Sequence, residues 1–105
     1  MHKNNKIIDA MKSDYQNYII HRIRMLREER GYTQGKIANV IGISNGQMGN
    51  IESPRTSHKY TIAQIQQICK EFNVPIEQLF LEDEDFAKGV DIISLLIDKI
   101  VKYVQ

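Results

Sequence analysis

The sequence lacks most of the features that mark secreted, membrane or metal-binding proteins. A single cysteine, Cys69, rules out an internal disulfide, and the three histidines, His2, His21 and His58, are too dispersed to suggest a metal site. The first residues, MHKNNKIIDAMKSDYQ, contain no uninterrupted apolar segment of the kind a secretory signal needs. No stretch reaches the roughly 18 charge-free apolar residues of a spanning helix. We therefore expect a soluble, cytoplasmic protein without a metal or cofactor.

Catalytic arrangements are missing as well. No nucleophile and base, paired carboxylates or phosphate-binding glycine loop occur at usable spacing, and no effector pocket is evident, so we expect neither an enzyme nor a small-molecule receptor. The alternation of apolar and polar residues that is typical of strands is also absent. With 105 residues, 42% hydrophobic and 26% charged, the chain has an ordinary globular composition and enough length for one modest core. We predict an all-α protein.

Net charge is close to zero, but the charges are unevenly distributed. The whole chain carries 14 Lys and Arg against 13 Asp and Glu. Residues 1–60 contain 10 basic and 5 acidic groups, net +5, whereas residues 61–105 contain 4 basic and 8 acidic groups, net −4. Such a split indicates one part that binds a polyanion and another that does not.

Apolar residues recur at helical spacing between capping residues, glycines and prolines. We predict helices over residues 17–30, 33–41, 44–53, 61–72, 75–81 and 86–104. Thr33, Ser44 and Thr61 are the expected N-caps, and the last two have a glutamine three residues later, which is the capping-box pattern. The inner faces are expected to carry Ile19, Ile20, Ile23, Leu26, Ile37, Ala38, Ile41, Ile43, Met48, Ile51, Ile62, Ile65, Ile68, Cys69, Phe72, Ile76, Leu79 and Phe80.

Residues 33–53, TQGKIANVIGISNGQMGNIES, carry the functional information. Two short helices joined by about four residues including a glycine must cross steeply, and Ala38 and Gly42 supply the small side chain and the turn that this crossing needs. The outer face of the second of these helices consists of small or amide residues: Asn45, Gly46, Gln47, Gly49 and Asn50. Because two glycines cost about 1 kcal/mol each relative to alanine in a helix, helix stability does not explain this surface.

These residues resemble the Cro and phage-repressor (XRE) type of helix-turn-helix transcriptional regulators. The resemblance covers about residues 18–81, through IRMLREERGYTQGKIANVIGISNGQMGNIE and TIAQIQQICKEFNVPIEQLF. It implies a five-helix, lambda-repressor-like DNA-binding domain, to which this chain adds a C-terminal helix. The implied domains are an arm or helix extension at 1–16, the DNA-binding domain at 17–81 and a dimerisation helix at 82–105.

The resemblance also implies how double-stranded DNA is bound. Residues 44–53 would form the recognition helix in the major groove, with Asn45, Gly46, Gln47 and Asn50 reading bases. Asn and Gln pair bidentately with adenine, and many relatives have Arg or Lys where this helix has none. We therefore predict readout weighted toward A·T pairs and DNA shape.

Phosphate contacts are expected around that helix. The predicted residues are Thr33, Gln34, Lys36, Ser44, Arg55, Ser57, His58, Lys59 and Tyr60. Four cations per subunit would give a log–log salt slope of about −3.6, at about −0.9 per phosphate. His58 is equally well interpreted as an ordinary loop residue. The arginines of the first helix, Arg22, Arg24, Arg27 and Arg30, are interpreted as a solvated face rather than a second DNA patch, with Arg27 paired to Glu52.

The C-terminal segment has a 4-3-4-3-4 spacing of apolar residues, at positions 86, 90, 93, 97, 100 and 104, which is typical of a helix-pairing seam, and Leu96 widens it. Its predicted dimerisation residues are Phe86, Val90, Ile93, Leu96, Ile97, Ile100 and Val104. We favour a homodimer, because a helix this apolar must be covered, with packing onto its own domain as the alternative. A second function remains open, in which the chain is an antitoxin or another protein-binding module that uses this helix to capture a partner protein.

Overall fold

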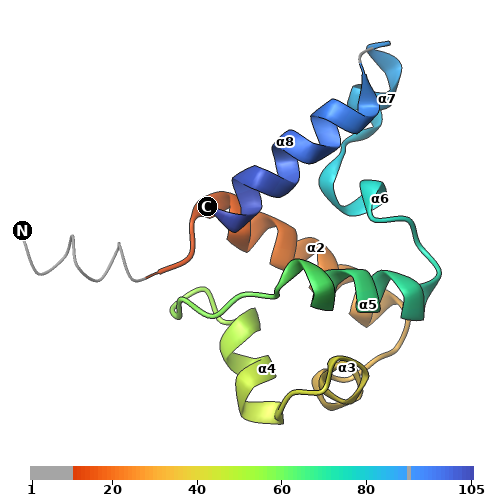
Figure 1. The fold of residues 1–105 in the computed structure, drawn as a ribbon. Coiled ribbons are helices and arrows are strands. Elements are labelled where there is room, and N and C mark those ends of the chain that lie inside the picture. The colour runs from red at the N-terminus through yellow and green to blue at the C-terminus, as the bar shows by residue number, and fades with distance from the viewer. Residues whose placement is uncertain (1–10, 90) are drawn as a thin grey trace, which may run out of the picture.

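The computed structural model describes residues 11–89 and 91–105, and all the regular elements in these ranges are helices, which confirms the all-α prediction. In chain order they are α2 (Asp14–Glu29), α3 (Gln34–Ile41), α4 (Asn45–Glu52), α5 (Ile62–Phe72), α6 (Glu77–Phe80), α7 (Asp83–Ala87) and α8 (Ile92–Val104). Figure 1 shows α3 and α4 at one end of the molecule and α7 at the opposite end, with α8 running from α7 back toward the start of α2. None of these helices is long and apolar enough to cross a membrane.

A single core joins the helices, and it includes all the residues predicted on their inner faces. Fully or nearly fully buried are Ile19, Ile20, Ile23, Ile37, Ala38, Ile41, Met48, Ile51, Ile65, Ile68, Cys69, Phe72, Leu79 and Phe80. The remaining predicted residues are partly buried against them: Leu26, Ile43, Ile62 and Ile76. Helical periodicity identifies these positions because each helix must bury one apolar stripe.

The first described helix begins earlier than predicted. Asp14 is its first residue, and Ser13 caps it through a reciprocal pair of hydrogen bonds with Gln16, at 3.1 Å to the Ser13 hydroxyl and 2.9 Å to the Gln16 amide oxygen. The predicted start at residue 17 was wrong because this capping box lies upstream of the first apolar pair. Because Ser13 caps its start, the helix extends only over residues 14–16 of the segment predicted as an arm or helix extension, and residues 1–10 of that segment lie outside the described residues.

The predicted helix over 86–104 is two helices. Lys88 and Gly89 separate α7 from α8, and Gly89 has a φ of 64°, a left-handed conformation that ends a helix. The predicted seam did not reveal this break, because the spacing of apolar residues carries no information about a change in backbone direction. An acidic run at residues 82–85 forms the start of α7, and Glu82 also pairs with Arg22 of α2 at 2.8 Å.

The last helix packs onto the domain through its inner side. Tyr103 is fully buried, and its hydroxyl donates to the Tyr60 carbonyl at 2.8 Å. Gln16 of α2 donates through Nε2 to the Tyr103 carbonyl at 2.7 Å, and Phe80 meets the Tyr103 ring edge-on at 5.9 Å between ring centres. The end of α8 is therefore part of the same core as α2, α3, α4, α5 and α6.

Candidate nucleic-acid interface

The two helices of the predicted DNA-binding unit, α3 and α4, are joined by a tight turn. Gly42 takes the left-handed conformation at φ 75°, which the end of α3 requires. The Ile43 amide then donates to the Ala38 carbonyl at 2.9 Å. Gly35 allows the starts of the two helices to approach, since a Cβ there would lie 3.2 Å from Oδ1 of Asn45. The crossing is thus set by small residues at both close contacts, of which the sequence interpretation found Ala38 but missed Gly35.

Both helices are capped as predicted. The Thr33 hydroxyl accepts from the Lys36 amide at 3.1 Å. Ser44 and Gln47 form the capping box, in which the Ser44 hydroxyl accepts from the Gln47 amide at 3.1 Å and Gln47 Oε1 accepts from the Ser44 amide at 2.9 Å. These bonds satisfy free amides at the two helix starts. In this structure the Gln47 side chain therefore lies along the helix start, with its Nε2 still available as a donor.

A buried ion pair fixes α4 against α2 and α3. Arg27 binds Glu52 in a bidentate manner, at 2.8 Å from Nε and 3.0 Å from Nη2, and it also donates to the Tyr32 carbonyl at 2.7 Å. The predicted pairing of Arg27 with Glu52 is confirmed. The hydrogen bond with Glu52, more than the opposing effect of burial, raises the pKa of the Arg27 guanidinium. A charged pair with this geometry defines the position of α4 relative to α2.

Gln34, predicted to bind a phosphate, is held in the same network. Its Nε2 donates to Oε1 of Glu52 at 2.8 Å. The sequence interpretation placed Gln34 at the start of α3 but missed this contact, because Glu52 lies 18 residues away in the chain. In this arrangement the Gln34 side chain links the start of α3 to the end of α4.

The predicted base-reading residues form one exposed surface. Asn45, Gly46, Gln47 and Asn50 are all exposed, and Gly49 between them is half-buried. On the opposite side of α4, Met48 and Ile51 are in the core. The helix thus presents amides and bare backbone to solvent on a rigid support.

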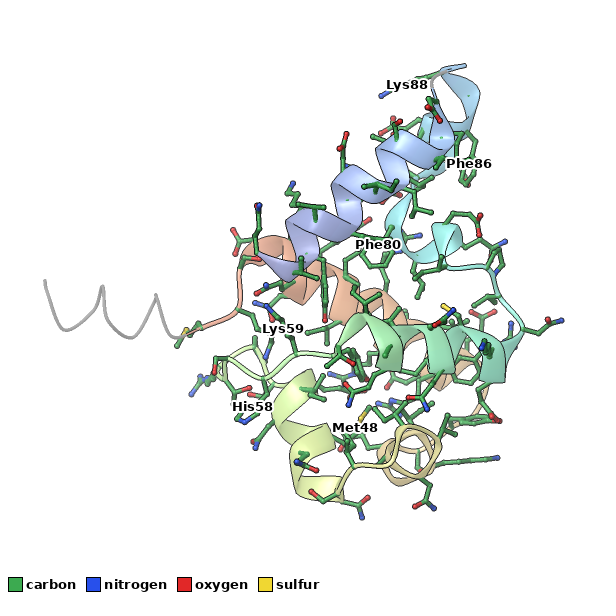
Figure 2. The ribbon with its side chains drawn as sticks, in the orientation of Figure 1. Met48, His58, Lys59, Phe80, Phe86 and Lys88 are labelled. Atoms are coloured by element: carbon green, nitrogen blue, oxygen red, sulfur yellow. The ribbon has the colours of Figure 1, made fainter. Side chains whose placement is uncertain are left out.

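Most of the predicted phosphate-binding residues lie on the loop after α4. Arg55, Ser57 and His58 are exposed, and Lys59 is half-buried. Figure 2 shows His58 and Lys59 on this loop, beside α4 and far from Phe86 at the other end of the molecule. On α3, Lys36 is exposed, with its Nζ 4.1 Å from the centre of the Tyr32 ring. Cations therefore flank the amide surface on two sides.

Tyr60 is the exception among the predicted phosphate contacts. Its side chain is fully buried, and its hydroxyl donates to the Met48 sulfur at 3.6 Å. Burial also raises the pKa of the Tyr60 hydroxyl above its ordinary value. The prediction for Tyr60 was wrong because a basic loop suggests exposure, whereas this residue ends the loop and enters the core beneath α4.

The loop is held by a residue that the sequence interpretation did not single out. Lys12 is 6% exposed. Its Nζ donates to the carbonyls of Ser53, Thr56 and His58 at 2.7, 2.8 and 2.7 Å. These partners lie 41 to 46 residues away in the chain, so no local pattern could have indicated them.

Most of the arginines of α2 make contacts within the fold and do not form the predicted solvated face. Arg27 is buried, so that interpretation was wrong for this residue. Arg22 also donates to the Gln78 carbonyl at 2.9 Å, and Arg30 donates to the Phe72 carbonyl at 2.7 Å, close to the end of α5. Arg24 is exposed and lies 3.7 Å from Glu28.

The predicted dimerisation residues divide into two sets. Leu96 and Ile100 are partly buried against the core of their own chain, which fits the alternative of packing within one subunit for these two residues. Exposed are Phe86, Ile93, Ile97 and Val104, together with Val101, which the seam did not include. Val90 lies outside the described residues. The apolar row of α8, defined here as Ile93, Ile97, Val101 and Val104, lies on one side of that helix at spacings of 4, 4 and 3.

One of three comparisons with known proteins, the scan of family models, agrees with this geometry. Neither the curated proteins nor the solved structures contain a match to the chain. A family model described as a helix-turn-helix domain matches residues 20–85, which is more than half of the sequence and includes α3, α4 and the connection between them. The chain therefore belongs to the helix-turn-helix domain family.

Proposed function

We propose that this protein is a sequence-specific transcriptional regulator of the Cro and phage-repressor (XRE) type that binds double-stranded DNA as a homodimer. One observation carries the proposal most strongly. The exposed surface of α4 consists of amides and glycines, is fixed by the Arg27–Glu52 pair, and is bordered by cations on α3 and on the loop after α4. Helix stability does not explain this surface. It exposes hydrogen-bonding groups on a single helix, which is the kind of element that enters a major groove.

Within this proposal, the amides of α4 read bases. Asn50 is exposed, and a bidentate pair with adenine contributes about 1 to 3 kcal/mol of discrimination. Gln47 can donate to a base from Nε2 while its Oε1 stays in the capping box, or can leave the box to pair bidentately. Because α4 carries no Lys or Arg, we expect A·T-rich half-sites.

Phosphate contacts supply most of the affinity in this proposal. Lys36, Arg55, His58 and Lys59 are the cations beside α4, so four contacts would give a salt slope of about −3.6 per subunit.

The proposal is tested by selecting bound sequences from a random DNA pool. We expect an enriched inverted repeat whose preferred bases change with Gln47→Ala and with Asn50→Ala. Gln67→Ala is the control, since Gln67 is an exposed glutamine of α5 outside the proposed surface. Selected sites without an inverted repeat, or sites unchanged by both substitutions in α4, would contradict the mechanism.

Dimerisation is supported by the apolar row of α8. Its four side chains are between 44% and 70% exposed, whereas Tyr103 holds the opposite side of the helix in the core. A second copy of α8 would cover these side chains. A dimer would also supply the two recognition helices that a palindromic site needs, since its half-sites lie about 34 Å apart.

Oligomeric state provides the test of this surface. Sedimentation of the full chain should give a dimer that becomes a monomer in Ile97→Glu. Asp98→Lys, at the neighbouring exposed position, should leave the dimer intact. A wild-type chain that is monomeric and aggregates until a different protein binds α8 would favour the second function, in which α8 captures a protein partner.

A further inference from the structure

Lys12 is a buried ammonium group surrounded by neutral oxygens. Besides the carbonyls of Ser53, Thr56 and His58, the Thr56 hydroxyl oxygen lies 3.2 Å from its Nζ. An ammonium has three protons, so these four acceptors saturate it. Burial lowers the pKa of Lys12 from its ordinary value. Burying a charge without an ionic partner is unfavourable unless hydrogen bonds replace its hydration, and here loop oxygens provide them.

The acceptors all belong to one irregular segment. Residues 53–61 contain no helix or strand, so their carbonyls have no ladder of regular hydrogen bonds. Three of those carbonyls converge on Lys12. Lys12 directly precedes the Ser13 cap of α2, and Figure 1 shows this segment beside the loop that joins α4 to α5. Lys12 therefore attaches this loop to the N-terminal end of α2.

The same contacts reach the proposed recognition helix. The Thr56 hydroxyl, which accepts from Lys12, donates to the Asn50 carbonyl in the last turn of α4. Ser53, whose carbonyl also accepts from Lys12, is the C-terminal cap of α4. A cation at this position also complements the negative end of the helix dipole.

We propose that Lys12 is a positioning residue for DNA binding, which aligns the last turn of α4 with the cationic loop at 54–59 without touching DNA itself. The inference rests on the proposed function. It gives Lys12 a defined role in presenting Asn50, Arg55 and Lys59 together as one surface.

The first test needs no DNA. Backbone order parameters from NMR relaxation of the full chain should show residues 54–59 as rigid as the helices, near 0.85, and below about 0.6 in Lys12→Met. Lys36→Met removes an exposed lysine of α3 and should leave the loop rigid. An unchanged loop in Lys12→Met would overturn the proposal.

A second pair of variants approaches the same contacts from the loop. Thr56→Val removes the hydroxyl that joins Lys12 to the Asn50 carbonyl and should loosen the loop in the same direction as Lys12→Met. Thr56→Ser keeps the hydroxyl and should retain wild-type order. If Lys12→Met fails to fold, the comparison of Thr56→Val with Thr56→Ser still tests whether these contacts order the loop. Equal order parameters in Thr56→Val and Thr56→Ser would then count against the proposal.

The closing experiment measures affinity for the selected DNA at several salt concentrations. Lys12→Met should bind at least about tenfold more weakly with an unchanged salt slope. Lys59→Met should lose about 0.9 from the slope, as expected for a lost phosphate contact. A similar loss of slope in Lys12→Met would mean that Lys12 itself contacts phosphate, and unchanged affinity would mean that the loop needs no positioning. Either result overturns the proposal. A wild-type chain that binds no DNA instead removes the proposed function, while the NMR test still reports whether Lys12 orders the loop.

Discussion

The end of the molecule formed by α3 and α4 and the end formed by α7 and α8 are built in different ways. At the first, hydrogen-bonded caps and the Arg27–Glu52 pair hold a polar surface that is complete without further burial. At the second, Tyr103 anchors a helix whose other side exposes apolar side chains. A polar surface of this kind suits the DNA contact proposed above, and the exposed apolar row suits the proposed contact with a second copy of the chain. The two ends are therefore suited to different contacts, and the near-zero net charge of the whole chain does not reveal this difference.

The largest expected effect is at the first end. Glu52→Ala removes one partner of the buried ion pair and leaves the Arg27 guanidinium uncompensated, so we expect a loss of about 3 to 5 kcal/mol in the free energy of unfolding. Urea denaturation of the full chain measures it. Glu28→Ala, at an exposed pair with Arg24, should change stability by less than about 0.5 kcal/mol. Equal effects of the two substitutions would show that the Glu52 pair does not hold α4.

Cys69 lies in the core that joins the two ends and can report whether either end opens. Burial raises the pKa of its thiol from the ordinary 9.0 to about 11, so the thiolate fraction at pH 8 falls about 100-fold. We expect alkylation of the folded protein to be at least about 100-fold slower than in urea. Rapid labelling of the folded chain would mean that the core opens locally near α5. Comparing the labelling rates of Glu52→Ala and Tyr103→Phe then tells which end governs the opening.

At the second end, Tyr103→Phe tests the anchor of α8. The substitution leaves the Tyr60 carbonyl without its donor in the core, so we expect a loss of about 1 to 3 kcal/mol. Tyr18→Phe is the matched control, because the Tyr18 hydroxyl bonds Glu82 at the surface and should contribute less than about 1 kcal/mol. Thermal unfolding of both variants measures the contrast. A Tyr103→Phe variant as stable as Tyr18→Phe would mean that ring packing alone holds α8.

The smallest expected effect separates stability from binding. Gly49→Ala introduces a Cβ that meets nothing within 4 Å in the protein, so it should stabilise the chain by up to about 1 kcal/mol. If DNA approaches this backbone closely, the same variant binds DNA more weakly. Gly42→Ala should destabilise the chain by about 1 to 2 kcal/mol instead, since Gly42 has a φ of 75°. A Gly49→Ala variant that is more stable and binds equally well would place DNA away from this part of α4.

Local signals predicted much of this architecture. The caps at Thr33, Ser44 and Thr61 and the Gly42 turn were predictable because each depends on residues three or four positions apart. The core followed from helical spacing for the same reason. The break at Gly89 was missed because an apolar seam continues across a glycine in the sequence even where the backbone reverses direction.

The sequence predicted which surface of α4 is exposed, but it did not predict the contacts of every residue in the candidate site. The exposed amides of α4 follow from the helix period, which puts Met48 and Ile51 inside and Asn50 outside. Two other residues depended on partners far along the chain. Tyr60 lies in the core, where its hydroxyl donates to the Met48 sulfur and its carbonyl accepts from Tyr103. Lys12 is buried among loop carbonyls that accept from its ammonium group.

By itself, the sequence determined that this chain is all-helical, where its helices are capped, and which surface of α4 is free of core residues, because these properties arise from interactions within one or two helical turns. Only the tertiary structure decided that Gln34 joins the Glu52 network, that Tyr103 completes the core, and that Lys12 holds the loop after α4. Those outcomes depend on contacts between distant segments, where burial makes an unpaired polar group unfavourable and therefore selects particular partners.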